Sequence, residues 1–249
     1  GPALPAVARD LGPLLGAGTV VMPAMNGVPW WFCQGVAGIG DAPLQSVDPG
    51  GTIAAAIDVA RVLGCVVHAS TSTPEPGHVL QKTGQRLIIG EPAGGRSERA
   101  QRVVDLLSGA GFDAEHSANV RQDIWYKLWG NMTMNPVSAF TGATVDRILD
   151  DPLANGFCRA VMNEAKAVGA AIGCPIEQTA DDRNAVTRKL GAIRTSMLQD
   201  VAAGKPIELD ALLTVVREIA QRAGVATPNL DALLGLARVF ARAHGLYPA

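Results

Sequence analysis

The chain has 249 residues, of which 48% are hydrophobic, 18% are charged and only 4% are aromatic, with 21 Lys and Arg against 23 Asp and Glu. This apolar fraction excludes a disordered chain, and the balanced charge gives no global signature of nucleic-acid binding. The length allows one large domain or two ordinary ones.

The cysteines and histidines show no metal-binding or disulfide pattern. The cysteines are scattered, at Cys33, Cys65, Cys158 and Cys174, which suits a reducing compartment. We assign no catalytic or metal-binding role to the isolated His68, His78, His116 and His244. No run of about 18 uncharged apolar residues indicates a membrane span. We therefore expect a cytoplasmic protein without a metal site. Its start, Gly1-Pro2-Ala3, lacks an initiator Met and a signal peptide and predicts a processed or truncated N-terminus.

Residues 1–118 alternate strand-like runs with turn residues. Residues 19–25 (TVVMPAM) form a strand-like run that ends at Asn26-Gly27, and residues 65–68 form a second, β-branched run. Strands that alternate with helices favour an α/β architecture for this half.

A hairpin and a helix follow in the same half. Residues 77–80 and 86–90 flank Thr83-Gly84, a pattern that predicts a hairpin. Residues 97–107 begin with the cap-compatible Ser97 and end close to glycines, so they predict a helix.

From residue 119 onward the strand signals fade and the apolar residues recur at helical spacing. We expect the second half to be mainly helical, with helices over residues 124–140, 151–172, 181–203, 207–223 and 230–244.

The glycines do not form a dinucleotide fingerprint, which needs G-x-G-x-x-G between a strand and a helix. Gly16-Ala17-Gly18 precedes a strand-like run, whereas Gly35, Gly38 and Gly40 lie in a polar loop with the spacing reversed. That loop, residues 35–51, follows Trp30-Trp31-Phe32. It is either a lid over a pocket or a surface loop anchored by aromatic residues.

A polar stripe lies on an otherwise apolar helix. Lys127, Asn131 and Asn135 recur every four residues, so they share one helix face and rise about 6 Å at each step. Buried polar groups need partners, which a ligand-lined cleft provides. In the alternative interpretation, Lys127 extends to solvent and the asparagines bridge neighbouring helices.

A second group surrounds a predicted helix junction. Ser196 begins the run Ser-Met-Leu-Gln-Asp, Gly204 ends a helix, and Pro206 starts the next, which places Glu208 in its first turn. The alternative is that Ser196 caps a helix or lies on the surface, and that Glu208 only complements the helix dipole. We assign Asp210 the latter role, on the opposite side.

Four motifs together resemble the ketopantoate reductase (2-dehydropantoate 2-reductase) family. They are residues 25–28 (MNGV), the Lys127/Asn131/Asn135 helix, residues 196–200 with Glu208 twelve residues after the serine, and residues 224–228 (GVATP). The resemblance runs from near residue 1 to about residue 235.

The resemblance implies an NADPH-dependent reduction of ketopantoate to pantoate, on the route to pantothenate and coenzyme A. It implies a partial, parallel-sheet, Rossmann-like domain (1–118) followed by a helical domain (119–249), with the active site between them. Lys127 is then the catalytic residue, and Asn131, Asn135 and Ser196 bind the substrate. Asn26 and Glu208 contact the cofactor.

The sequence also departs from the family pattern. The family's glycine-rich loop is upstream of everything visible here, which predicts that about 60 to 80 residues precede Gly1. A further family asparagine, expected about ten residues after Asn135, is replaced in the stretch Thr144-Val145-Asp146. Two alternatives therefore stay open: a related reductase of another branched 2-keto acid, and a truncated helical interaction module. A homodimer is compatible with the apolar helices.

Overall fold

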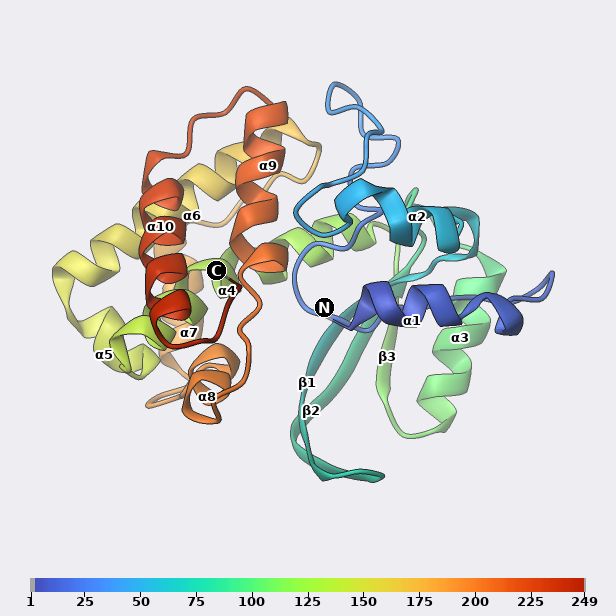
Figure 1. Ribbon diagram of the computed structural model, residues 1–249, viewed down its shortest axis with the longest axis horizontal. Helices are drawn as coiled ribbons and strands as arrows, with labels where there is room; N and C mark the ends of the chain where they lie inside the picture. Colours follow the sequence, from blue (N-terminus) through green and yellow to red (C-terminus); the bar gives the residue numbers. More distant parts are fainter. Residues whose placement is uncertain (1–2, 249) are drawn as a thin grey trace.

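The computed structural model describes residues 3–248, and Figure 1 shows the sheet with α1–α3 on one side of the molecule and the bundle α5–α10 on the other. The elements are α1 (Leu4–Asp10), η1 (Gly12–Leu14), η2 (Pro49–Gly51), α2 (Thr52–Ala56), η3 (Val59–Arg61), β1 (Gly64–Glu75), β2 (His78–Gly90), α3 (Glu98–Gly109), β3 (Asp113–Ser117), α4 (Val120–Thr141), α5 (Val145–Asp150), α6 (Pro152–Ala171), α7 (Ala180–Arg188), α8 (Ser196–Ala202), η4 (Asp210–Thr214), α9 (Val215–Arg222) and α10 (Pro228–Ala243). Gly1, Pro2 and Ala249, at the outer ends of the two expected domains, lie outside the described residues.

The sheet is mixed rather than parallel throughout, as had been expected, because β1 and β2 form a hairpin. Its order is β1-β2-β3, with β1 antiparallel to β2 and β2 parallel to β3. The strand expected over residues 19–25 is reduced to two parallel bridges, Val21 with Val62 and Ala24 with Cys65. Pro23 lies between the two bridges and has no N–H to donate to a ladder. The segment nevertheless extends the sheet beside β1.

The hairpin exists, but its turn is not at Thr83-Gly84. Glu75 pairs with His78, so the turn is Pro76-Gly77, with Gly77 at φ +81°. A Pro-Gly pair suits a tight turn better because proline fixes its own φ and glycine adopts a positive one. Thr83-Gly84 instead lies within β2 at a register shift, where Gly84 has φ +68°.

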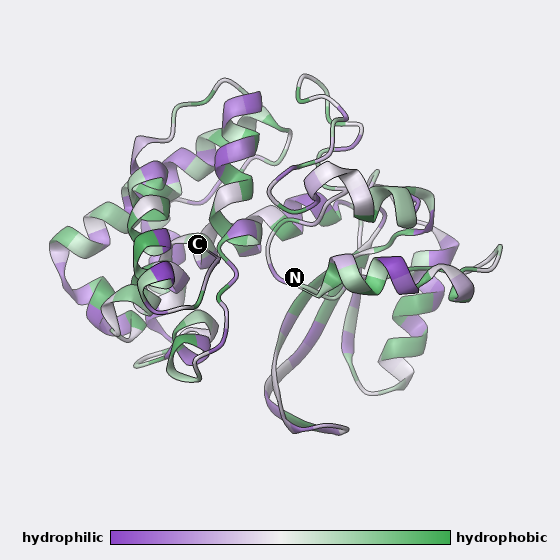
Figure 2. Ribbon diagram, in the orientation of Figure 1, coloured by the Kyte–Doolittle hydropathy of each residue, from purple (hydrophilic) through white to green (hydrophobic). Residues whose placement is uncertain are grey.

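The sheet separates two apolar cores because successive side chains of a strand point to opposite faces. Cys65 and Ile89 belong to the smaller core under α3, whereas Val66 and Ile88 belong to the main core with α4. Ser97 caps α3, since its Oγ accepts from the Ala100 N–H at 3.1 Å, as the sequence predicts. Figure 2 shows apolar and polar residues alternating around the helices.

The second half is helical, as expected, although three details differ. The helix expected over 181–203 is two helices, α7 and α8, because Gly191 adopts φ +71° between them. The helix expected over 207–223 begins with the π-helical turn η4. The short helix α5 was not expected. Helix α4 spans the helix expected over 124–140 and continues through Pro136 as far as Thr141.

This architecture confirms the expected fold class, an α/β region followed by an all-helical region. Strand β3 is followed directly by α4. Helix α4 packs against β1 and against the helices α6, α8 and α10. Among residues 3–248, no helix is long and apolar enough to cross a membrane.

Candidate functional site

The ammonium group of Lys127 lies between the sheet and α4, where it has two hydrogen-bond acceptors. Its Nζ donates to Oδ1 of Asn26 at 2.8 Å and to the carbonyl oxygen of Val67. Burial lowers the pKa of Lys127 from 10.5 to about 8, against a smaller opposing influence of Cys65. The interpretation in which Lys127 simply extends to solvent is therefore wrong: the group is fixed at two points, and its pKa lies close to neutral pH.

Asn26 reaches Lys127 because Gly27 allows its backbone to approach η4. Gly27 has φ +78°, and a Cβ added to it would lie 2.3 Å from the carbonyl oxygen of Ala211. That oxygen accepts from the Val28 N–H at 2.9 Å. The π-helical turn leaves the oxygen available, since the Val215 N–H bonds to Asp210 instead. The Asn26-Gly27 pair thus joins the sheet region to the helical region.

A small cavity brings together three of the six expected site residues: Asn26, Lys127 and Asn131. Its lining residues are Met25, Asn26, Gly27, Cys65, Val66, Ile124, Lys127, Leu128 and Asn131. An ammonium group and two carboxamides around one cavity can bind and protonate a carbonyl oxygen.

Asn135 and Ser196 lie beyond this cavity. Asn135 is buried, with 8% of its surface exposed, in the part of α4 that the rest of the helical region covers. Ser196 is exposed at the first residue of α8, and α8 packs against α4. Ser196 is not the cap, because the Oγ1 of Thr195 accepts from the Leu198 N–H at 3.2 Å.

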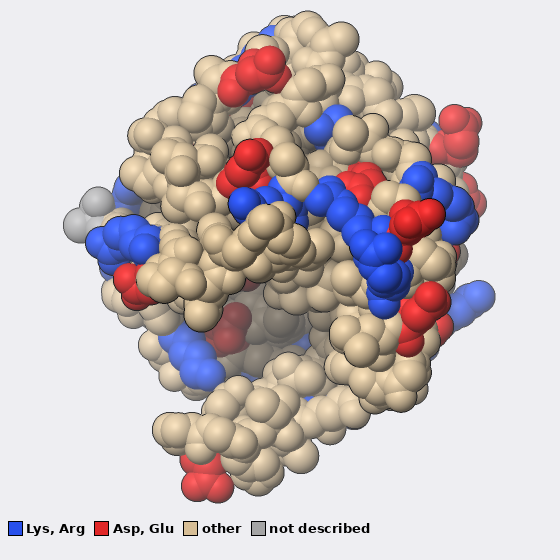
Figure 3. Space-filling model, turned by 90° about the vertical axis from the view of Figure 1, so that its right-hand side faces the viewer, with Lys and Arg blue, Asp and Glu red and all other residues tan. Residues whose placement is uncertain are grey.

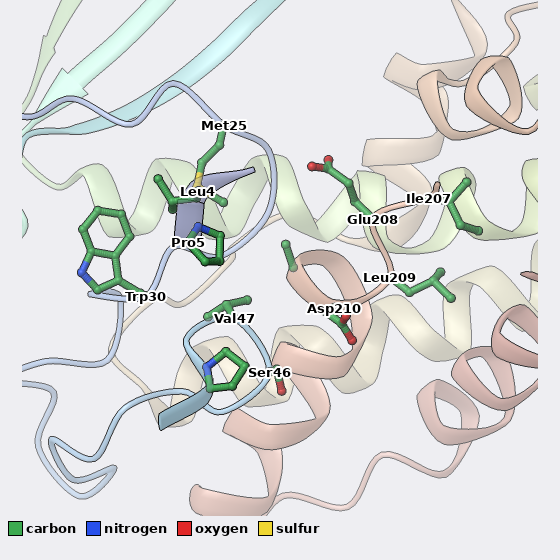
Figure 4. Close-up of a pocket in the computed structure, with 12 residues that line it drawn as sticks. Leu4, Pro5, Met25, Trp30, Ser46, Val47, Ile207, Glu208, Leu209 and Asp210 are labelled. Atoms are coloured by element: carbon green, nitrogen blue, oxygen red, sulfur yellow. The ribbon is translucent and has the colours of Figure 1, made fainter. Parts of the chain in front are cut away.

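A larger pocket lies next to the small cavity, and Met25 lines both. Glu208 lines this pocket, and Figure 4 shows its carboxylate directed toward the Met25 side. Asp210 also lines it, but its Oδ1 accepts from the Tyr247 hydroxyl at 2.5 Å. Asp210 is therefore held by the C-terminal segment rather than serving only the helix dipole.

The loop over residues 35–51 forms another wall of the larger pocket, through Ser46, Val47 and Pro49. It is attached to α9: Glu218 accepts from the Ser46 N–H at 2.8 Å and from the Ser46 hydroxyl at 2.6 Å. Arg222 donates to the carbonyl oxygens of Ala42 and Pro43, both at 2.7 Å. The loop therefore borders the pocket and is held against α9 by Glu218 and Arg222, and its role as a lid stays a prediction.

Sequence reasoning missed His68, which lies beside the expected catalytic residue. His68 pairs with Arg86 across the hairpin. Burial lowers the pKa of His68, and the positive charges of Lys127, Arg86 and Arg183 lower it further. These residues come from separate elements, so no spacing along the chain could indicate the cluster.

Figure 3 shows the molecule hollowed above the hairpin tip at the bottom of that view.

The family model described as ketopantoate reductase PanE/ApbA C terminal matches residues 119–241. A 2-dehydropantoate 2-reductase from Mesorhizobium japonicum is 40% identical over 239 residues, which cover 96% of this chain and 73% of that protein. The chain belongs to the ketopantoate reductase family. A crystal structure assigned as a ketopantoate reductase, from Ralstonia solanacearum, matches this family member with a TM-score of 0.94 and 57% identity, covering 99% of this chain and 75% of the other.

The same fold occurs in a D-mandelate dehydrogenase, whose structure contains NADH and anilino(oxo)acetate. Its TM-score is 0.80 at 19% identity, and the match covers 98% of this chain and 74% of that one. The fold of the ketopantoate reductase family is therefore shared with a dehydrogenase that binds a nicotinamide cofactor.

Proposed function

We propose that the protein reduces ketopantoate to pantoate with NADPH, and that Lys127 is its catalytic acid. The observation that carries the proposal is the partly buried ammonium of Lys127, held 2.8 Å from Asn26 at a cavity that Asn131 also lines. Hydride addition to a ketone leaves negative charge on its oxygen, and an ammonium within hydrogen-bond distance stabilises that charge and donates the proton.

The surroundings of Lys127 suit this role. Burial brings its pKa to about 8, so the group remains mostly charged at neutral pH yet gives up its proton readily. Asn26 and Val67 orient the ammonium by accepting two of its three hydrogens, which leaves the third for the ketone oxygen. Asn131 is one helical turn further on and can donate to the substrate hydroxyl or carboxylate.

The residues present fit the nicotinamide end of NADPH, which when bound would supply the hydride. The larger pocket is concave and mostly apolar, as small-molecule sites are, and it shares Met25 with the Lys127 cavity. Asn26 and Glu208 would contact the cofactor there. We assign Asn135 and Ser196 to the substrate, with the Ser196 hydroxyl donating to the carboxylate.

We also propose the division into a dinucleotide-binding region (1–118) and a helical region (119–249). The start of α4 at Val120, with Asn119 as its cap, supports a boundary at this point. A homodimer remains part of the proposal.

The test is the oxidation of NADPH by the purified protein, including any residues encoded before Gly1, with ketopantoate and a panel of other 2-keto acids. Pantoate as the preferred product, identified by mass spectrometry, is the expected result. Benzoylformate and branched 2-keto acids belong in the panel because Val145, in the stretch where the family asparagine is expected, is an apolar residue with 3% exposure. If the protein prefers one of these acids, that acid replaces ketopantoate as the proposed substrate. If it reduces neither ketopantoate nor any other acid of the panel, the proposal is overturned.

A further inference from the structure

Arg183, on α7, has its guanidinium against α4 directly beside the polar stripe. The Cζ of Arg183 lies 5.5 Å from the centroid of the Tyr126 ring. A Cβ added to Gly130 would lie 2.9 Å from Nη2 and 3.0 Å from Nε of the same guanidinium. The absence of a side chain at Gly130 therefore makes the room that the guanidinium occupies.

The guanidinium of Arg183 has no anionic partner in the part of the chain that the structure describes. Other arginines around α7 are paired: Arg188 with Asp150 at 2.5 Å, and Arg159 with Asp181 at 2.9 Å. The Arg183 guanidinium makes no ion pair or hydrogen bond with any described residue, and its Nε is buried without a partner. A partly buried cation without an anion is unfavourable unless a ligand provides one.

Arg183 packs on the surface of α4 next to the position of Lys127. Gly130, against which the guanidinium lies, follows Lys127 by three residues, and positions three apart on a helix are surface neighbours about 5 Å apart. In a 2-keto acid the carboxylate carbon is bonded directly to the ketone carbon, so two neighbouring cations can address the two groups separately.

We propose that Arg183 binds the carboxylate of the 2-keto acid while Lys127 contacts the ketone oxygen; this rests on the proposed function. The guanidinium lies over the Tyr126 ring and has no hydrogen bond to any described residue, so its N–H groups are left for a bidentate carboxylate. Arg183 supplies the charge that selects an acid, and the Ser196 hydroxyl adds a neutral hydrogen bond.

Steady-state kinetics on Arg183→Met and Arg183→Lys, with a 2-keto acid and its neutral methyl ester, test this assignment. In Arg183→Met the KM for the acid should rise about 10- to 100-fold, as for a lost hydrogen bond to a charged group. The KM for the ester, the kcat and the Kd for NADPH should change little. Arg183→Lys should recover part of the loss, because it keeps the charge without the planar fork.

Arg188→Met is the matched control, since it removes an arginine from the same helix that is already paired with Asp150. It should leave the KM for the acid unchanged. An unchanged KM for the acid in Arg183→Met, or equal effects on acid and ester, would overturn the Arg183 assignment alone. A wild-type protein that reduces no 2-keto acid would overturn the proposed function and this assignment with it.

Discussion

The regions around Lys127 and Ser196, two of the expected site residues, differ in how firmly the side chain is held. Lys127 is hydrogen-bonded to Asn26 and Val67, and Gly27 is in contact with η4. Ser196, in contrast, is exposed on the seven-residue helix α8. In the proposed mechanism the proton donor is therefore preorganised, whereas Ser196 is exposed to solvent before the substrate binds.

The largest effect is expected from Lys127→Ala, which removes the preorganised ammonium group itself. We expect kcat for keto-acid reduction to fall by about 10²- to 10⁴-fold, because proton donation and stabilisation of the ketone oxygen are both lost. Circular dichroism and thermal unfolding should show an intact fold. Turnover near the wild-type rate would remove Lys127 from the mechanism.

Gly27→Ala tests whether the position of Asn26 beside Lys127 depends on the close approach of the Gly27 backbone to η4. The added Cβ would lie 2.3 Å from the Ala211 carbonyl oxygen at a φ of +78°. We expect a loss of about 1–3 kcal/mol in the free energy of unfolding, together with reduced kcat as Asn26 is displaced. Gly109→Ala is the control, because its Cβ would have nothing within 4 Å and its φ is not positive. Equal melting temperatures for the two variants would contradict the close approach.

The pH dependence tests the charge state of Lys127. Its pKa in the free protein is lowered to about 8, and the protonated form is the acid. The kcat/KM for reduction should therefore be level below about pH 8 and fall about tenfold per pH unit above it, until another ionisation intervenes. A profile that stays level up to about pH 10 would mean that Lys127 is not the proton donor.

The smallest effect is expected at Ser196, the exposed residue of α8. Ser196→Ala should raise the KM for the keto acid about 2- to 10-fold, with kcat and NADPH affinity unchanged, because one neutral hydrogen bond is lost. Thr195→Ala is the companion variant: it removes the cap of α8 and should lower stability as well. Weaker NADPH binding with an unchanged KM for the keto acid would mean that Ser196 contacts the cofactor rather than the substrate.

Local periodicity and capping predicted much of the helical region and little of the sheet. The polar stripe on α4 followed from a four-residue spacing, and Ser97 caps α3 as its position before an apolar-periodic run predicts. The hairpin turn was misplaced because two pairs that contain glycine, Pro76-Gly77 and Thr83-Gly84, compete along the sequence. Only the pairing of β1 with β2 decides between them.

The sequence by itself determined that one lysine and two asparagines share a face of a largely apolar helix, because helical geometry fixes that arrangement within a single segment. Only the tertiary structure decided that Asn26 holds Lys127, that Gly27 must approach η4, and that Arg183 lies beside Gly130. These contacts join residues that are far apart in the chain, so packing rather than local propensity sets them.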